Sequence, residues 1–383
     1  MNKLREYYWA YRNKISDKLF GMAKMPAKGK RKSRVLISYI IEPFKVVPSK
    51  GFSTFHTMYW ECYEIARLFS ERGYEVDIVN PKKRSFIPRK NYAVCFDSGH
   101  NFEKWINFLP KDCKKIYPIL MTNWQEYNLA EKTRLKNLAD RRGVSLIPRR
   151  QLPSTSNPEM ANYLVGFGNK TIFASFEKYH KPIIFIPISA VVQYDFPENK
   201  NWDMAKKNFL WIGGGGAVLK GLDIVLEAFS KMPDLELHVC GPIAAEKDFV
   251  AEYDKELNGT PNIHVYGRID VVGNKFKEIV TQCGAVVYPS GGDGTSGAIV
   301  QAMHAGLVPL ISHETGVQED SGYIPITDPT PEAVAKVVRD FSSLPNERVR
   351  ELAKKTWLYA RAIYTREEFS KAYARFMDEI MKI

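Results

Sequence analysis

The chain has 383 residues, 45% of them hydrophobic and 26% charged, which is typical of a folded protein of about two domains and excludes wholesale disorder. No apolar run approaches the roughly 20 residues of a membrane-spanning helix, and the longest candidate, residues 183–192, is interrupted by Pro187. The net charge of +12 is concentrated in residues 1–34, which hold eleven Lys or Arg against Glu6 and Asp17, so the nearly neutral remainder argues against a nucleic-acid-binding surface across the fold.

The first residues and the cysteines favour a cytoplasmic location. Charged residues stand at positions 3, 5 and 6, where a signal peptide would need its apolar core. The cysteines are odd in number, widely spaced and without a Cys-x-x-Cys pair, so they predict reduced thiols and no zinc site. They are Cys62, Cys95, Cys113, Cys240 and Cys283.

Residues 1–33 are predicted to form a basic leader that begins with an amphipathic helix. Apolar residues recur in it at spacings of three and four, which places them along one side of a helix. They are Leu4, Tyr8, Tyr11, Ile15, Leu19 and Met22. Two interpretations stay open. The helix and the basic run 28–34 could hold the protein reversibly on an anionic membrane surface, or the helix could dock on the body while the basic run is solvated.

From residue 34 onward, short apolar runs alternate with helical segments. Strands that are continuously apolar are buried on both faces, as in parallel sheets. The predicted strands are residues 35–41, 76–79, 92–96, 116–121, 163–165 and 183–188, then 209–212, 237–239, 263–266, 285–288 and 308–311. The predicted helices include residues 59–72 and 125–142, and the chain is expected to be helical after Pro331, with a last helix over 366–383.

The fold class is therefore predicted as α/β, with two doubly wound Rossmann-like domains that face each other across a cleft. The N-terminal domain is predicted over residues 34–195 and the C-terminal domain over 208–345. Residues 196–207 form a polar linker, and helices over 346–383 pack back toward the N-terminal domain.

Four consecutive glycines, Gly213, Gly214, Gly215 and Gly216, follow a predicted strand, and Lys220 stands just before the next helix. Glycine amides can approach an anion closely, and Lys220 adds a charge at the helix N-terminus, so the segment suits a diphosphate. It is neither a Walker loop nor a Gly-x-Gly-x-x-Gly turn. A tight turn without a ligand is the alternative, but four glycines exceed what such a turn requires.

A second loop, residues 290–297, also leads from a predicted strand directly into a helix and contains three kinds of small residue, Gly, Ser and Thr. Such a helix N-terminus is a second candidate anion site. Asp293 lies in this loop, and Gln301 follows about two helical turns later, so both side chains can face one bound molecule.

These two segments resemble the nucleotide-sugar half of GT-B fold glycosyltransferases, specifically the retaining group called family 4. The resemblance covers about residues 34–340; it is specific in the second half and architectural in the first. It implies that the four glycines, Lys220 and the Ser290 loop hold the donor diphosphate, and that Asp293 contacts the sugar and Gln301 the ribose. The other residues implied are Gly294, Thr295, Ser296 and Gly297 at the diphosphate, and Gly267, Arg268 and Ile269 around the base.

Two departures from the family pattern stand out. The family usually has Glu at the position of Gln301, and an Arg after the first glycine of the turn, where this chain has Gly214. An amide can both donate to and accept from ribose hydroxyls, so binding can survive the first change. The missing arginine removes a charge from the leaving group, and Arg268 is a candidate replacement.

Four histidines are weighed separately. His100 follows a predicted strand where ligands of open α/β sheets bind, and it resembles the N-terminal-domain histidine of the family that faces the sugar. With Asp293 and Lys220 it completes the predicted catalytic set. His56 lies at the cleft mouth, and with Asp97 it is a candidate base if the reaction inverts. His304 and His313 are expected to be structural.

The sequence therefore predicts a hexosyltransferase-type glycosyltransferase (EC 2.4) that moves a sugar from a nucleotide diphosphate sugar to a glycan or lipid-linked acceptor. The resemblance implies retention, and because no Asp-x-Asp is present, neither a metal nor another cofactor is expected. A role in surface polysaccharide or glycoconjugate synthesis, at the inner face of the membrane, is the expected context. The alternatives are a degenerate member that binds nucleotide or glycan without turnover, and a nucleotide-sugar epimerase.

Overall fold

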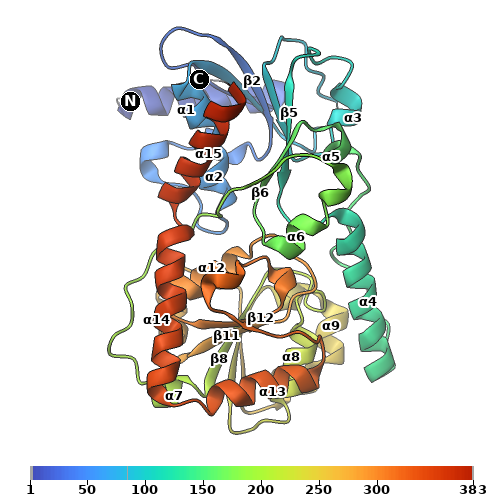
Figure 1. The fold of residues 1–383 in the computed structure, drawn as a ribbon, viewed down its shortest axis with the longest axis vertical. Helices are drawn as coiled ribbons and strands as arrows, with labels where there is room; N and C mark the ends of the chain where they lie inside the picture. The colour runs from blue at the N-terminus through green and yellow to red at the C-terminus, as the bar shows by residue number, and fades with distance from the viewer. Residues whose placement is uncertain (1–2, 84, 382–383) are drawn as a thin grey trace.

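The computed structural model describes residues 3–83 and 85–381, which form two parallel-sheet domains stacked along the long axis of the molecule (Figure 1). The N-terminal sheet has seven strands in the order β1-β3-β2-β4-β5-β6-β7, and all pairs are parallel except β1 with β3. Its strands are β1 (Met22–Met25), β2 (Ser33–Ser38), β3 (Tyr74–Val79), β4 (Val94–Asp97), β5 (Lys114–Ile119), β6 (Tyr163–Gly166) and β7 (Ile183–Phe185). Its helices are α1 (Lys3–Phe20), α2 (Met58–Glu71), α3 (Phe102–Trp105), α4 (Trp124–Arg142), α5 (Asn157–Met160) and α6 (Lys170–Ala174).

The C-terminal sheet is parallel throughout, with the order β10-β9-β8-β11-β12-β13. Its strands are β8 (Asn208–Ile212), β9 (Glu236–Cys240), β10 (Ile263–Gly267), β11 (Ala285–Tyr288), β12 (Val308–Ile311) and β13 (Ile324–Pro325). The helices of this half are α7 (Trp202–Ala205), α8 (Leu222–Phe229), α9 (Lys247–Glu252), α10 (Asp254–Gly259), α11 (Asn274–Gln282), α12 (Gly297–His304), α13 (Pro331–Ser342), α14 (Asn346–Ile363) and α15 (Arg366–Met381). The predicted fold class is confirmed. Neither β1 nor β13 was among the predicted strands.

Long helices bridge the two domains on opposite sides of the molecule (Figure 1). On one side α14 packs on α12 of the C-terminal domain, and α15 continues to α2 of the N-terminal domain. The Trp60 and Phe369 rings lie 5.5 Å apart there, and Arg72 forms an ion pair of 2.6 Å with Asp378.

On the other side, α4 leaves the N-terminal domain and runs down alongside the C-terminal domain. Arg141, in its last turn, forms ion pairs with buried Asp223 (2.7 Å) and with Glu227 (3.1 Å). Arg142 pairs with Glu252 on α9 at 2.6 Å. This helix therefore fixes the two domains against each other next to the cleft.

The leader is part of the N-terminal domain, in contrast to its prediction as a separate element. The helix ends at Phe20 because Gly21 adopts φ +60°, so Met22 does not continue the apolar stripe but begins β1. Asn13 is buried: its amide group donates to the Phe44 carbonyl at 3.0 Å, and its oxygen accepts from the Lys24 amide at 3.0 Å. The docking interpretation of the helix is therefore correct for the face that carries Asn13.

The linker predicted over 196–207 is also packed. Phe196 and Trp202 are both 92% buried and stack with ring centroids 6.1 Å apart, and Trp357 of α14 covers Phe196. The domain boundaries themselves stay a prediction. All five cysteines are buried free thiols. No helix in the described residues is long and apolar enough to cross a membrane.

Candidate active site

A cleft of about 570 Å³ lies between the carboxyl ends of the two sheets. The N-terminal wall comes from residues just after β2 and β5, among them Tyr39 and Met121, and the opposite wall comes from the loops after β8, β10 and β11. The predicted residues that line it are Gly213, Gly214, Gly215, Lys220, Arg268, Ile269, Asp293, Gly294, Thr295, Ser296, Gly297 and Gln301. Four predicted residues, Gly216, Gly267, Ser290 and His100, are not among the described lining residues.

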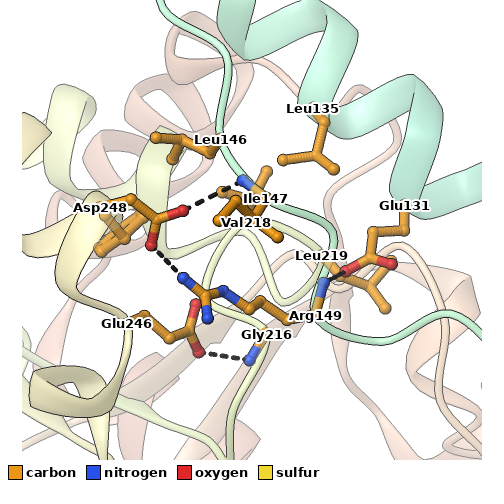
Figure 2. Close-up of a pocket in the computed structure, with 11 residues that line it drawn as sticks. Glu131, Leu135, Leu146, Ile147, Arg149, Gly216, Val218, Leu219, Glu246 and Asp248 are labelled. Atoms are coloured by element: carbon orange, nitrogen blue, oxygen red, sulfur yellow. Dashed lines mark hydrogen bonds and ion pairs between the residues drawn. The ribbon is translucent and has the colours of Figure 1, made fainter.

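The glycine turn is only partly open to a ligand. The amide of Gly216 donates to the buried Glu246 carboxylate at 2.6 Å (Figure 2). The amide of Ala217 donates to the same carboxylate at 3.1 Å, and the amide of Gly213 donates to the Cys240 carbonyl at 3.0 Å. The amides of Gly214 and Gly215 donate to no other described residue. They are therefore the two amides of the turn that an incoming anion can reach without displacing a protein group.

Lys220 lies at the centre of the site, with its side chain only 7% exposed. Its ammonium donates to the Tyr288 hydroxyl at 2.8 Å and forms an ion pair of 3.0 Å with Asp293. Burial and the neighbouring Asp293 raise the pKa of Tyr288 well above its usual range. The phenol therefore stays neutral, accepts from Lys220 and donates to Asp293 at 3.1 Å.

The loop that carries Asp293 is held from both domains. The backbone carbonyl of Asp293 accepts from the Thr122 amide of the N-terminal domain at 3.1 Å. The backbone amide of Asp293 donates to the Glu314 carbonyl of the C-terminal domain at 2.9 Å. A Cβ at Gly294 would come within 2.3 Å of the Leu120 carbonyl. Only glycine fits at this position because the N-terminal domain approaches the loop so closely. Ser290 lies behind the loop with its hydroxyl 3.3 Å from the Asp293 carboxylate.

The opposite end of the cleft is closed by the segment before α2. The Arg268 guanidinium lies 4.9 Å from the centre of the Phe55 ring, and the Thr54 hydroxyl donates to Asp270 at 3.3 Å. Arg268 and Ile269 thus line the cleft, whereas Gly267 accepts from the Gly241 amide in the wall behind them. Arg268 is stacked away at Phe55, so the structure gives no contact between it and the Lys220 end of the site.

Gln301 is already engaged in this structure. Its amide nitrogen donates to the Val192 carbonyl at 2.8 Å and its oxygen accepts from the Val192 amide at 3.2 Å, so it clasps the segment that connects the domains. Contact with a ribose requires this pair to exchange for substrate hydroxyls. The predicted ribose role of Gln301 stays a prediction.

The histidine that reaches the cleft is His56. His100 is not among the described residues that line the cleft, and the loop after β4 that carries it is held by the buried Asp97 carboxylate, which accepts from the Gly99 and Asn101 amides. His56 Nδ1 accepts from the Met58 amide at 3.1 Å, which favours the tautomer with its proton on Nε2.

Desolvation in the cleft lowers the pKa of His56, the charge of Asp293 opposes this effect, and the charge of Lys220 adds to it.

The other two candidate histidines, His304 and His313, have structural contacts. His304 is buried against the Tyr364 carbonyl at 2.9 Å, and His313 bonds the Tyr323 hydroxyl at 2.7 Å. Among the described residues, no group of three His, Cys, Asp or Glu side chains could hold a metal ion.

Tyr288 and Arg150 are two residues of the site that were not predicted from the sequence. Tyr288 is the last residue of β11, and its place at the carboxyl end of a buried strand was a usable signal. Arg150 lies in irregular chain after α4, where no motif marks it, and it lines the cleft beside the glycine turn.

Solved structures with this fold are distant in sequence. Sucrose-phosphate synthase from Thermosynechococcus elongatus aligns with a TM-score of 0.62 at 12% identity, over 92% of this chain and all of that one. WaaG, described as a glycosyltransferase involved in lipopolysaccharide biosynthesis, aligns with a TM-score of 0.51 at 15% identity, over 90% of this chain and 98% of that one. A variant of S. aureus TarM, solved with fondaparinux, alpha-GlcNAc-glycerol and UDP, aligns with a TM-score of 0.53 at 12% identity, over 74% of this chain. This chain spans about half of TarM, 54% of its length.

The family comparison is more specific. Residues 206–343 match the family model described as "Glycosyl transferases group 1". This segment of the C-terminal domain is therefore similar to group 1 glycosyltransferases. The match includes the glycine turn, Lys220 and the Asp293 loop, so the resemblance of these segments to GT-B fold glycosyltransferases is confirmed, and the solved structures confirm the fold. No curated protein matches the chain.

Proposed function

We propose that this protein transfers a sugar from a nucleotide diphosphate sugar to a glycan or lipid-linked acceptor. The observation that carries the proposal is the position of Lys220 inside the glycosyltransferase domain, where it faces the cleft next to the open amides of Gly214 and Gly215. A buried cation and two amides suit the departing diphosphate, whose developing charge they would stabilise. Hexosyl transfer is the proposed form of the reaction.

We further propose retention without a metal ion. Lys220 and the N-terminus of α12 supply positive charge at the place where a metal would otherwise act. His56 is the cleft residue that could act as the base of an inverting reaction, so the configuration of the product, followed by NMR during turnover, decides between the two. Full activity in the presence of EDTA is the expected result for metal independence.

Nucleotide binding tests the proposal first. We expect one nucleoside diphosphate of a panel of UDP, GDP, ADP and TDP, with CMP as a fifth ligand, to raise the melting temperature selectively. A ligand at 100 times its dissociation constant adds about 2.7 kcal/mol to the free energy of unfolding. UDP is measured first because TarM was solved with it. Absence of any shift would contradict the proposed donor.

A protein that binds nucleotide without turnover is the second candidate. The pairing of Gln301 with the Val192 backbone favours it, because this pairing occupies the predicted ribose contact. Selective nucleotide binding with neither hydrolysis of the donor sugar nor transfer to an added acceptor would support this candidate over the enzyme.

The acceptor is proposed to be reached at an anionic membrane surface through the outward face of α1. The stripe predicted from the sequence points away from the body: Leu4, Tyr8, Tyr11 and Leu19 are each more than 60% exposed. Basic side chains on the same helix are exposed beside them, namely Lys3, Arg5, Arg12, Lys14 and Lys18. Aromatic and aliphatic side chains with flanking cations suit the interface of an anionic leaflet.

Vesicle binding tests this surface. We expect the triple variant Tyr8→Ser/Tyr11→Ser/Leu19→Ser to lose at least tenfold in binding to vesicles of phosphatidylglycerol and phosphatidylcholine, while its melting temperature is unchanged because these side chains are exposed. The variants Leu129→Ser and Leu358→Ser, on α4 and α14, are controls of similar exposure. Equal binding by the triple variant would refute the surface. Deleting residues 1–33 is a poorer test, since it also removes β1 from the sheet.

A further inference from the structure

Arg150 belongs to the N-terminal domain but lies against the glycine turn of the C-terminal domain. Its backbone is fixed by the buried Glu131 of α4, whose carboxylate accepts from the amides of Arg149 and Arg150 at 2.7 and 2.8 Å. The side-chain amide of Gln151 donates to the same carboxylate at 2.7 Å. Figure 2 shows the neighbouring Arg149, whose amide donates to Glu131, together with Gly216 of the turn. The position of Arg150 is therefore set by a rigid helix.

The aliphatic part of the Arg150 side chain explains why the last residue of the turn, Gly216, is a glycine. A Cβ at Gly216 would lie 2.4 Å from Cγ and 2.9 Å from Cδ of Arg150. Gly216 also adopts φ +91°, which disfavours any side chain. The turn is thus shaped to receive a side chain from the opposite domain.

The guanidinium of Arg150 is only partly used by the protein. Its Nε donates to the Tyr127 hydroxyl at 3.0 Å. Within residues 3–83 and 85–381, the structure shows no hydrogen bond from its two terminal nitrogens, although a guanidinium has five N–H donors. Arg150 lines the cleft, so these remaining donors are available to a ligand there.

The charges around Arg150 point to an anion. Burial opposes its charge, yet the pKa of Arg150 is raised, because Tyr127, Asp293 and Tyr288 act in the other direction. Lys220 approaches the same carboxylate from the C-terminal domain at 3.0 Å. Asp293 is thus paired with Lys220 and acts on Arg150 only through its charge, and the two cations, one from each domain, line the same cleft as the open amides of Gly214 and Gly215.

We propose that Arg150 binds the diphosphate of the donor from the N-terminal domain, together with Lys220 from the C-terminal domain. The inference rests on the proposed function and names a residue that supplies the second cation of that site. A guanidinium can bind two phosphate oxygens at once, which a lysine cannot do with the same geometry. Because Arg150 and Lys220 come from different domains, the diphosphate site is complete only where the domains meet.

The test compares Arg150→Gln with Arg149→Gln. The glutamine keeps most of the aliphatic contact with Gly216, and Arg149 lies in the same segment but forms its ion pair with Asp248, outside the cleft. We expect Arg150→Gln to bind the nucleoside diphosphate identified by the panel, and inorganic pyrophosphate, 10- to 100-fold more weakly by calorimetry. The corresponding nucleoside should bind unchanged, and Arg149→Gln should stay within about twofold for every ligand.

A second-site rescue separates a direct role from a structural one. A Cβ at Gly214 would meet no heavy atom within 4 Å, and its φ lies outside the left-handed region, so an arginine can be placed there from the C-terminal domain. We expect Gly214→Arg to restore most of the diphosphate affinity lost in Arg150→Gln. Unchanged diphosphate affinity in Arg150→Gln, or an equal loss for nucleoside and diphosphate, would overturn the inference. If the unmodified protein bound no nucleoside diphosphate, the proposed function itself would fail.

Discussion

Replacement of Lys220 by methionine is expected to weaken binding of the nucleoside diphosphate 10- to 100-fold and to lower the rate of sugar transfer about 10²- to 10³-fold. A hydrogen bond to a charged group contributes about 1.5–3 kcal/mol, which gives the loss of affinity. The larger loss of rate follows because the charge on the leaving diphosphate grows as the bond to the sugar breaks. Calorimetry with the nucleoside diphosphate and initial rates with the donor sugar measure the two effects separately.

The stability of this variant needs its own control. Lys220 is paired with Asp293 and Tyr288, so its loss leaves a carboxylate beside the cleft without its cation. Removing one partner of a buried pair costs about 3–5 kcal/mol, and cleft water should keep the loss toward the lower end. Lys200→Met is the matched control: this buried lysine donates to the Val280 and Cys283 carbonyls, away from the cleft. Equal weakening of nucleotide binding in both variants would contradict a phosphate role for Lys220.

Asp293→Asn is expected to have the opposite effect on nucleotide affinity. The asparagine can still accept from Lys220 and Tyr288, but the negative charge that now neutralises Lys220 is gone. The affinity for the nucleoside diphosphate should therefore rise severalfold, since two charges about 4 Å apart interact by about 1 kcal/mol even in water. The transfer rate should fall 10- to 100-fold if the carboxylate contacts the sugar.

Asp270→Asn is the control for this experiment, because it removes the same charge from the same cleft at the end where Thr54 contacts it. Asp270→Asn should change neither the affinity for the nucleoside diphosphate nor the transfer rate by more than about twofold. A fall in nucleotide affinity in Asp293→Asn, with transfer reduced in proportion, would show instead that Asp293 organises the loop between β11 and α12.

The fold and one wall of the site could be predicted because their causes are local in the sequence. Buried parallel strands read as continuous apolar runs, and the glycine turn with Lys220 is a contiguous motif; both were found with small errors at the strand ends. Strand β1 was missed because its pairing with β3 depends on the docking of α1 through Asn13, a contact that no periodicity reveals.

The other wall could not be predicted, since contacts between the domains set it. Arg150 lies in irregular chain, and only the rigid α4 with its ion pairs to the C-terminal domain carries it to Gly216. Both His100 and His56 follow strands of the same sheet, and the sequence favoured His100 because it resembles the family histidine that faces the sugar. The structure places His56 in the cleft lining and not His100, whose loop is held by hydrogen bonds to Asp97.

The burial of every cysteine makes this chain suitable for site-directed labelling. All five thiols are shielded from solvent, and burial raises the pKa of each, so few thiolates form at neutral pH. A maleimide dye should therefore react with a cysteine introduced at an exposed position while the native thiols remain. Single cysteines introduced by Tyr8→Cys and Leu358→Cys, both at exposed positions, would report separately on lipid contact at α1 and on the surface of α14, in the otherwise unmodified protein.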